Sequence, residues 1–419
     1  MENITKTLCT ICRDRPFGPN CSKTISMISV SEARKIISDN VTALTAITSS
    51  IQKAAGHVLA ADIYAAHNIP AFPQSSMDGY AFSFGDWKQG EGLPLTGEMQ
   101  AGSADQSRLK PGTAIRIFTG APVPEGADTV VMQEKTKLSD NKLFIEDPAI
   151  RINLNVRPEG SEIRAGELAL SAGTILTPAA IGFLAAIGVT ELSIYPRPSI
   201  SIIITGKELQ EPGLDLKYGQ VYECNSFTLG SALNQLHFDK LTINQVDDDL
   251  AALTEVLSAS LNRSDVVLLT GGISAGDYDF VFQAANNCGV ESKFHKIKQR
   301  PGKPLYFGTK GGKLVFGLPG NPSSVLTCFY EYAMPAIFQL ANQQKSLQVV
   351  QASLANNFKK VKELTHFAKG FFDGKKVTIL DAQESYRLSS FAKANCLVVM
   401  EEDRIIYEEE EIVDIHLLP

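Results

Sequence analysis

Residues 265–323 contain three turns of unusual composition, and a buried-strand pattern leads into the first of them. The strand pattern is the apolar run 265–270, and the Gly-Gly turn that follows it extends over residues 271–279. The second turn is Arg-Pro-Gly-Lys-Pro at 300–304, and the third is Gly-Leu-Pro-Gly-Asn-Pro-Ser at 317–323. Each turn alone is common in proteins, but three such turns in this order and spacing indicate that they contribute to one binding site.

The residue types in these turns favour an anionic ligand. Gly271 and Gly272 allow backbone N–H groups to approach a ligand closely. Asn321 can cap a helix with Pro322 at its first turn, which would aim free N–H groups and the positive end of the helix dipole at the same place. Lys303 adds a full positive charge between a glycine and a proline. We therefore expect a phosphorylated ligand or an oxyanion.

Composition excludes several classes of protein. A chain of 419 residues is expected to form two to four domains. The net charge of −7 argues against general nucleic-acid binding, because no excess of Lys and Arg is available to neutralise phosphates. The longest apolar stretch, residues 179–189, is too short to span a bilayer. Seven scattered cysteines do not suggest a disulfide framework, so we expect a reducing cytoplasm.

Three cysteines lie close together near the N-terminus. Cys9, Cys12 and Cys21 have zinc-like spacing, but a fourth ligand is needed and the next histidine is His57. A disordered extension with free thiols over residues 1–26 is therefore favoured over a metal site. The sequence leaves the role of these cysteines open.

Residues 27–196 combine helical and β patterns. A helical pattern begins at Ser31, and Thr177-Pro178 is expected to start a helix that ends at Gly188. Between them, residues 65–150 are rich in Gly, Pro and short β-type runs, which predicts a small β-rich insert. One loop of this region carries Ser-Ser-Met-Asp-Gly-Tyr-Ala at 75–81, where the Asp-Gly pair is typical of a turn.

From residue 197 the pattern alternates between strands and helices. It predicts a doubly wound α/β domain over residues 197–342, in which ligands bind beyond the carboxyl ends of the strands. Residues 343–419 show strand signals and an Asp-Gly hairpin turn at 373–374, which predict a small C-terminal β-domain. The expected strands are 199–205, 240–246, 266–270, 290–295 and 313–316, and the expected helices are 226–236, 250–259, 278–287 and 323–340.

Carboxylates and cations follow several of these strands. Gly206, Asp247 and Gly271 fall at strand ends, so we expect three loops at one crevice. Converging carboxylates would repel one another unless a cation lay between them, and oxygen ligands suit Mg²⁺. Asp249 is equally compatible with a helix cap. The carboxylates concerned are Glu208, Asp247, Asp248, Asp249, Asp277 and Asp279, and the nearby cations are Lys296, Arg300 and Lys303.

The motifs, taken in order, resemble the molybdenum cofactor biosynthesis family that includes MoeA and the gephyrin E domain. The similarity runs from Met27 to Pro419. Besides the three turns, it rests on the segments 76–81, 116–122, 130–134 and 205–209. The resemblance implies a discontinuous, elongated N-terminal α+β region of two intertwined subdomains at 27–196, followed by a molybdopterin-binding α/β domain and a C-terminal β-domain.

The resemblance also implies an activity. Family members are homodimeric molybdopterin molybdenumtransferases that take adenylylated molybdopterin and molybdate, release AMP with Mg²⁺ or a similar cation, and have their site at the subunit interface. A molybdopterin adenylyltransferase is a further implied partner, whereas nucleic acid and membrane are not. The sequence leaves open whether molybdenum or tungsten is preferred.

Individual roles follow from the same resemblance. The implied catalytic residues are Asp78 and Thr119, reaching the site from the partner subunit, with Glu208, Asp279, Lys296 and Lys303. The implied metal ligands are Glu208, Asp247, Asp249 and Asp279, although which aspartate of 247–249 faces the site stays open. The implied substrate-binding residues are Gly271, Gly272, Ser274, Arg300, Pro301, Gly302, Pro319, Gly320, Asn321 and Pro322.

Some positions depart from the family pattern. Lys207 stands where the family usually has Asp, next to the expected metal ligand Glu208. The segment 383–386 lacks the glycines that are common in the family, which leaves a substrate role for it in doubt. These departures motivate an alternative hypothesis, a non-catalytic molybdopterin-binding or scaffold paralogue. Competence-damage-type nucleotide hydrolases share the α/β fold, but they lack the region 27–196.

Overall fold

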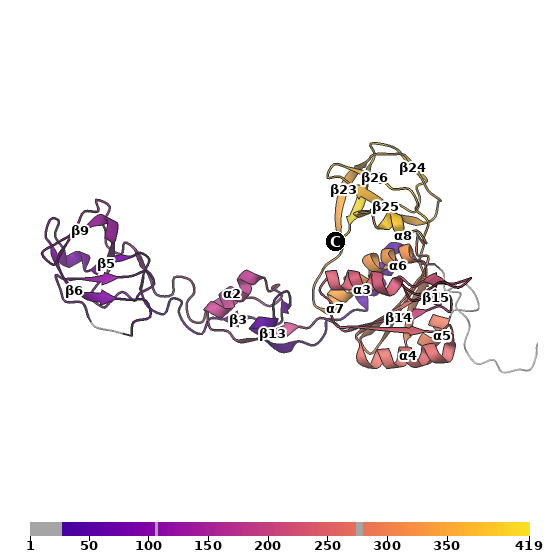
Figure 1. The fold of residues 1–419 in the computed structure, drawn as a ribbon, viewed down its shortest axis with the longest axis horizontal. Coiled ribbons are helices and arrows are strands. Elements are labelled where there is room, and N and C mark those ends of the chain that lie inside the picture. The colour runs from indigo at the N-terminus through magenta and orange to yellow at the C-terminus, as the bar shows by residue number, and fades with distance from the viewer. Residues whose placement is uncertain (1–26, 105–107, 274–279) are drawn as a thin grey trace, which may run out of the picture. The chain divides into compact units, whose positions relative to one another are not determined.

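The structure, a computed structural model, describes residues 27–104, 108–273 and 280–419. The chain divides into two compact units. One unit is Leu44–Pro196, and the other combines the residues up to Ala43 with Arg197–Pro419 (Figure 1). Within the described residues, no helix is long and apolar enough to cross a membrane.

The unit Leu44–Pro196 contains a small sheet packed against a helix. The sheet has the order β1-β13-β2, and a two-stranded sheet pairs β12 with β3. Helix α2 begins as the sequence predicts, since the Thr177 hydroxyl accepts from the N–H of Ala180 and Pro178 stands in the first turn. The elements are β1 (Ile47–Ser50), β2 (Val58–Leu59), β3 (Ile63–Tyr64), β12 (Leu168–Leu170), α2 (Pro178–Ala186) and β13 (Glu191–Tyr195), with a 3₁₀ turn at Ile51–Lys53.

The same unit contains the predicted β-rich insert. Its six-stranded sheet has the order β8-β5-β7-β6-β10-β9, and β4 pairs with β11 beside it. Buried Tyr80, Phe82 and Leu143 form part of its core. The strands are β4 (Gln74–Ser75), β5 (Gly79–Phe82), β6 (Leu93–Met99), β7 (Ala114–Ile117), β8 (Thr129–Met132), β9 (Thr136–Ser139), β10 (Lys142–Ile145) and β11 (Val156–Arg157), with 3₁₀ turns at Phe84–Asp86 and Gln133–Lys135.

The α/β domain is a six-stranded sheet of order β17-β14-β18-β22-β21-β19. The first four strands are parallel, and β21 and β19 add an antiparallel edge. Helices α3, α6 and α7 lie on one face and α4 and α5 on the other, which confirms the doubly wound arrangement (Figure 1). The strands are β14 (Ile200–Thr205), β17 (Leu241–Val246), β18 (Val266–Thr270), β19 (Glu291–Lys296), β21 (Pro304–Lys310) and β22 (Lys313–Leu318).

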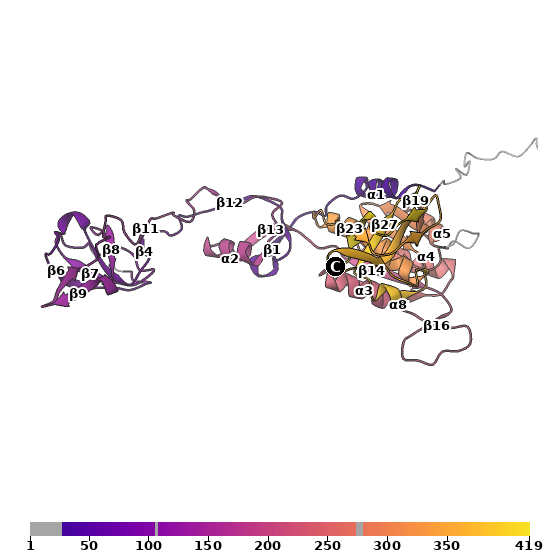
Figure 2. The same ribbon diagram turned by 90° about the horizontal axis from the view of Figure 1, so that it is seen from above.

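The helices of this domain follow the predicted ones closely. The long expected helix 323–340 is continuous but changes its hydrogen-bonding pattern, because a π-helical segment at Phe329–Ala333 separates α6 from α7. A two-stranded parallel sheet of β15 (Leu209–Gln210) and β16 (Val221–Tyr222), with the loop between them, extends from the domain (Figure 2). The helices are α3 (Asn225–Gln235), α4 (Leu250–Arg263), α5 (Phe280–Asn287), α6 (Pro322–Cys328) and α7 (Met334–Leu340).

The C-terminal β-domain has one strand that comes from outside it. Its sheet has the order β20-β25-β26-β23-β29-β27, and β20, which contains Arg300, pairs in parallel with β25. The predicted hairpin turn connects β25 with β26. The elements are β20 (Gln299–Arg300), β23 (Gln348–Leu354), β24 (Phe358–Lys359), β25 (Thr365–Phe372), β26 (Lys376–Ile379), α8 (Leu388–Phe391), β27 (Cys396–Met400), β28 (Ile406–Tyr407) and β29 (Ile412–Leu417).

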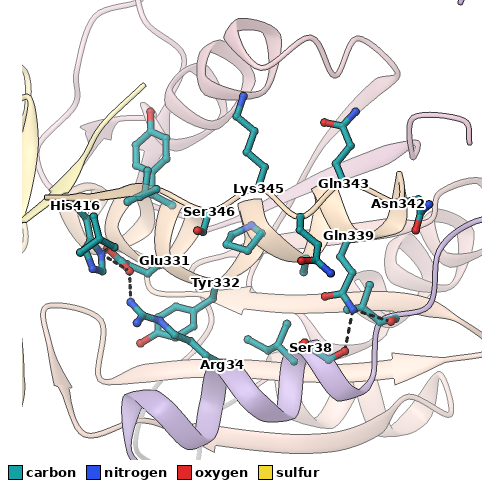
Figure 3. Close-up of a pocket in the computed structure, with 18 of the residues that line it drawn as sticks. Arg34, Ser38, Glu331, Tyr332, Gln339, Asn342, Gln343, Lys345, Ser346 and His416 are labelled. Carbon is teal, nitrogen blue, oxygen red and sulfur yellow. Dashed lines mark hydrogen bonds and ion pairs between the residues drawn. The ribbon is translucent and has the colours of Figure 1, made fainter. Parts of the chain in front are cut away.

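Helix α1 (Val30–Asp39) is joined to both of these domains by a buried carboxylate. The Glu331 side chain is 2% exposed, and its oxygens lie 2.5 Å from Arg34 of α1 and 2.8 Å from His416 Nδ1 of β29. Gln339 Nε2 also donates to the carbonyls of Ser38 and Val41, each at 3.0 Å. These contacts line a cavity of about 740 Å³ (Figure 3). The first described helix is therefore an integral part of the unit that contains the α/β domain.

Candidate functional site

The four parallel strands of the α/β domain end at one edge of the sheet. In the strand register, Thr205 lies beside Val246, and Thr270 lies beside both Ile204 and Leu318. The turns that follow these strands begin with Gly206, Asp247, Gly271 and Pro319. The carboxyl edge therefore gathers the loops, as the sequence predicts for a ligand-binding crevice.

Close backbone approach explains Gly271. Its φ is +83°, and a Cβ atom there would lie 2.3 Å from the carbonyl oxygen of Thr205. A Cβ on Gly320 would lie 3.7 Å from the Cα of Gly271, so the first and third turns lie against each other. Asn225 of α3 holds the third turn by donating to the Gly320 carbonyl at 2.9 Å. The structure thus brings together two of the turns that the sequence singles out.

The second and third turns share a cavity of about 400 Å³. Among the predicted residues it is lined by Arg300, Pro301, Gly302, Lys303, Pro319 and Asn321. The two cationic side chains belong to exposed residues, so they are free to meet a ligand from solvent. Lys296 ends β19, and its residue does not line this cavity.

A buried glutamine shapes the turn that carries these cations. Gln299 is fully buried, and its Nε2 donates to the carbonyls of Pro301 and Gly302 at 3.0 and 3.1 Å. Its Oε1 accepts a hydrogen bond from the Tyr332 hydroxyl. Gly302 has a φ of +84°, and a Cβ there would lie 2.4 Å from Cys328 Sγ. This internal support is not evident from the sequence, because Gln299 precedes the motif, and Tyr332 and Cys328, which also contact this turn, lie about thirty residues further along the chain.

The start of α6 differs from the prediction. Asn321 is at the N-cap position, but its side chain makes no capping bond and instead donates to Ser385 Oγ at 2.9 Å. The N–H of Ser323 donates to the Ser385 carbonyl at 3.1 Å. Pro322 has no N–H to offer. The N–H groups expected to face a ligand are therefore partly used to bind the C-terminal domain.

The C-terminal domain completes the surroundings of Arg300. Gln383, Glu384, Ser385 and Tyr386 line the 400 Å³ cavity, so the segment 383–386 contributes to its wall. A neighbouring cavity of about 300 Å³ is lined by Arg300 together with Lys359, Lys360 and His366. The sequence does not point to Lys359, Lys360 and His366, because they are more than fifty positions away from Arg300. The pairing of β20 with β25 places His366 beside Arg300.

His366 in this second cavity is buried and uncharged at neutral pH. Its residue is 7% exposed, and its Nε2 makes no hydrogen bond with the described residues. Burial, together with the positive charges of Lys360 and Arg300, lowers the pKa of His366 to about 4. Lys360 is also buried, and its Nζ donates to three backbone carbonyls, those of Val361, Leu364 and Glu402.

The described carboxylates do not form a Mg²⁺ site by themselves. Asp249 caps α4, since its Oδ1 accepts from the N–H of Ala252 at 2.9 Å, and this agrees with the alternative reading of that residue. Glu208 and Asp247 are exposed. No group of three potential ligands occurs among residues 27–104, 108–273 and 280–419. Ser274, Asp277 and Asp279 lie outside the described residues.

Asp78 and Thr119 form a pair in the unit Leu44–Pro196. They stand at the ends of the neighbouring strands β5 and β7, and Asp78 Oδ1 accepts from both the N–H and the hydroxyl of Thr119 at 2.8 Å. These two hydrogen bonds lower the pKa of Asp78, and the charge of Arg116 contributes a smaller effect. Asp78 is therefore an exposed, ionised carboxylate held in one orientation.

Comparison with known proteins identifies each part of the chain. Residues 28–188 match the family model "MoeA N-terminal region (domain I and II)", residues 201–339 match "Probable molybdopterin binding domain", and residues 351–418 match "MoeA C-terminal region (domain IV)". The chain is 34% identical over 362 residues to a protein of Haemophilus influenzae named "Molybdopterin molybdenumtransferase", covering 85% of this chain and 89% of the relative.

Two further comparisons agree with this assignment. A Staphylococcus aureus (strain Mu50) protein with the same name is 30% identical over 383 residues, covering 89% of this chain and 91% of the relative. The crystal structure of a "molybdopterin biosynthesis moea protein" from Pyrococcus horikosii aligns with a TM-score of 0.81 and 28% identity, covering 94% of this chain and 99% of that chain. The sequence, the fold and the arrangement of the turns therefore place the chain in the MoeA family of molybdenum cofactor biosynthesis.

Proposed function

We propose that this chain is a molybdopterin molybdenumtransferase. It takes adenylylated molybdopterin and molybdate, releases AMP, and leaves molybdenum on the dithiolene sulfurs of the pterin. The names of the Haemophilus influenzae and Staphylococcus aureus relatives support this reaction. We place the reaction in the cytoplasm and expect a molybdopterin adenylyltransferase to supply the adenylylated substrate.

One observation carries the proposal: two cations and two Gly-Pro turns surround one cavity at the carboxyl edge of the sheet. Arg300 and Lys303 come from a turn that buried Gln299 fixes, and Pro319 and Asn321 come from the turn after β22. Guanidinium and ammonium groups bind phosphate and oxyanions by charge-assisted hydrogen bonds. The arrangement suits a substrate with a phosphoanhydride and a molybdate that must be held near it.

Residues outside this cavity are assigned by the resemblance. We propose that Asp78 and Thr119 complete the site from the partner subunit of a homodimer, with Asp78 held ionised by its two hydrogen bonds. We further propose that Glu208, an aspartate of 247–249 and Asp279 serve the metal and molybdate, and that Lys296 helps to hold phosphate and oxyanion. Mg²⁺ would neutralise the charge that develops on the phosphates as AMP leaves. Among the described residues, Glu208 and Asp247 alone do not complete a metal site, so Asp279 or the substrate itself would have to supply further ligands.

AMP release from adenylylated molybdopterin, with molybdate and Mg²⁺ present, tests the function. Wild-type protein is expected to release AMP in a molybdate-dependent reaction. Lys303→Met is expected to raise KM by about tenfold or more, because one charge-assisted contact to the substrate is lost. Lys375→Met removes the same charge from an exposed hairpin turn and is expected to behave like wild type.

The two arms of this test have different meanings. Absence of AMP release by wild-type protein, with tight binding of adenylylated molybdopterin retained, would contradict the proposal and favour the non-catalytic scaffold. Equal KM values for Lys303→Met and wild type would remove Lys303 from the site while leaving the activity in place. The scaffold alternative is not favoured, since the relatives that cover most of this chain carry the enzyme's name.

A further inference from the structure

Lys369 of β25 is a lysine without access to solvent. Its residue is 2% exposed, although lysine is among the residue types that are least often buried. Its ammonium group donates to three carbonyls of a single turn, those of Ala382 at 2.8 Å, Arg387 at 3.1 Å and Glu384 at 3.4 Å. All three N–H bonds of the ammonium group are thereby used.

The turn that Lys369 holds, residues 381–387, has further bonds to the same strand. The amide side chain of Gln383 accepts from the N–H of Lys369 at 2.9 Å and donates to its carbonyl at 2.8 Å. Gln383 also donates to the carbonyl of Leu380 at 2.7 Å, and Ser390 Oγ donates to that of Ala382 at 2.7 Å. The 381–387 turn is therefore held by hydrogen bonds to β25 and to α8.

The opposite side of the 381–387 turn faces the proposed substrate cavity. Ser385 accepts from Asn321 Nδ2 through its hydroxyl and from the N–H of Ser323 through its carbonyl, at 2.9 and 3.1 Å. Four residues of the turn, Gln383 to Tyr386, line the same cavity as Arg300 and Lys303. A change in the shape of this turn would thus move both the cavity wall and the start of α6.

We propose that Lys369 is a positioning residue: its ammonium group holds the 381–387 turn in the shape that forms one wall of the substrate cavity. The identity of the substrate depends on the proposed function, whereas the contacts of Lys369 with the turn do not. Burial lowers the pKa of Lys369 to about 8, so the side chain still carries its charge and all three donors at neutral pH. Any buried ammonium group needs acceptors, and here all three belong to the one turn that lines the cavity.

The test compares Lys369→Met with Lys376→Met. Methionine keeps the length of the lysine stem but cannot donate, so three buried carbonyls lose their partner. Lys376 lies on neighbouring β26 and pairs with Glu410 on the surface. Lys376→Met therefore removes the same charge from the same sheet and is the matched control. Lys369→Gln, which retains two donors, is expected to be intermediate and serves if Lys369→Met does not fold.

Two measurements give the result. Amide hydrogen exchange, measured on the full chain without substrate, is expected to accelerate in residues 381–387 and 319–324 of Lys369→Met, but not in β23 or β29. In the AMP-release assay, KM for adenylylated molybdopterin is expected to rise roughly ten- to hundredfold with a much smaller change in kcat, because a misplaced wall weakens binding. Lys376→Met should change neither quantity.

The opposite results are equally clear. Unchanged exchange in both segments, or equal acceleration over the whole C-terminal domain, would overturn the positioning role and leave Lys369 a core residue. Altered exchange with an unchanged KM would also overturn it, because the turn would then be irrelevant to the substrate. If wild-type protein releases no AMP, the proposed function fails, while the exchange measurement still decides whether Lys369 controls the turn.

Discussion

At the scale of single residues, His366 is the clearest case of a side chain whose ionisation depends on its surroundings. Its pKa is lowered to about 4 by burial and by two neighbouring cations. As pH falls from 6.5 to 4, the unfolded chain takes up a proton that the folded chain does not, so the free energy of unfolding decreases through this window. The loss amounts to about 3 kcal/mol by pH 4.

This sets an expectation for acid stability. His366→Gln is expected to remove that part of the pH dependence, so that the variant loses less stability than wild type between pH 7 and pH 4. Thermal unfolding measured over this range provides the check. His67→Gln, which changes an exposed histidine, should retain the wild-type slope. An identical slope for His366→Gln and wild type would show that another group causes the acid sensitivity.

Lys207 is the sequence departure with the most direct electrostatic consequence. Its residue is exposed, so solvent and salt screen its charge. Lys207→Asp is therefore expected to lower the Mg²⁺ concentration for half-maximal AMP release by no more than about tenfold. A poorly screened charge at about 5 Å would contribute roughly 3 kcal/mol, which corresponds to more than about a hundredfold. Lys217→Asp is the matched control. A hundredfold change in Mg²⁺ requirement would mean that residue 207 faces the metal directly.

At the scale of elements, the fold could be predicted where the signals are local. The run 266–270 matches β18 residue for residue, and Thr177-Pro178 and Gly188 delimit α2 as expected. The sequence pattern does not predict strand β21, because its first residue, Pro304, belongs to a motif that is typical of a turn. The capping role of Asp249 can be predicted from sequence, because it depends only on the start of α4 a few residues away. A role as a metal ligand cannot, because it depends on groups that are distant in sequence.

The glycine after Asp78 shows how one element limits substitution. A Cβ on Gly79 would lie 1.9 Å from the carbonyl oxygen of Val131, in the pairing of β5 with β8. Gly79→Ala is therefore expected to separate these strands and lower the free energy of unfolding of the β-rich insert by several kcal/mol, on the order of an overpacked core site.

The single tryptophan of the chain makes this measurable. Trp87 packs against Phe82 and Phe84 in the same insert, so its fluorescence follows the unfolding of this part. Gly85→Ala, where a Cβ would meet nothing within 4 Å, is the control and should unfold like wild type. A Trp87 transition at the wild-type temperature in Gly79→Ala would contradict the expected clash.

At the scale of the whole molecule, the proposed homodimer predicts that each site combines residues of two chains. Asp78→Asn and Lys303→Met change residues that belong to different units of the chain. If the active site combines these units from two subunits, each variant homodimer is impaired, but a mixed dimer retains one intact site. At a substrate concentration well below KM, where Lys303→Met is strongly impaired, randomly mixed equal amounts should recover about one quarter of wild-type AMP release. Activity of the mixture equal to the mean of the two separate variants would show that each chain completes its own site.

The candidate site could be predicted from sequence only in part, because some of its residues are brought there by contacts between distant parts of the chain. The motifs around Arg300, Lys303 and Asn321 are local and could be recognised. The roles of Ser385, His366 and Lys369 could not, because each depends on contacts between the α/β domain and the C-terminal domain or within the latter's core. Residues without a motif acquire a place in the site only through the tertiary structure.

The pairing of β20 with β25 has a consequence for protein engineering. A boundary drawn at residue 343 separates two segments of sequence, but it cuts through one hydrogen-bonded sheet. A chimera that takes residues 343–419 from a relative would set a foreign β25 against the native edge strand β20, which contains Arg300. The C-terminal domain and the Arg-Pro-Gly-Lys-Pro turn therefore form one exchangeable module, and a transplant that moves either without the other should disturb the register on which the placement of Arg300 depends.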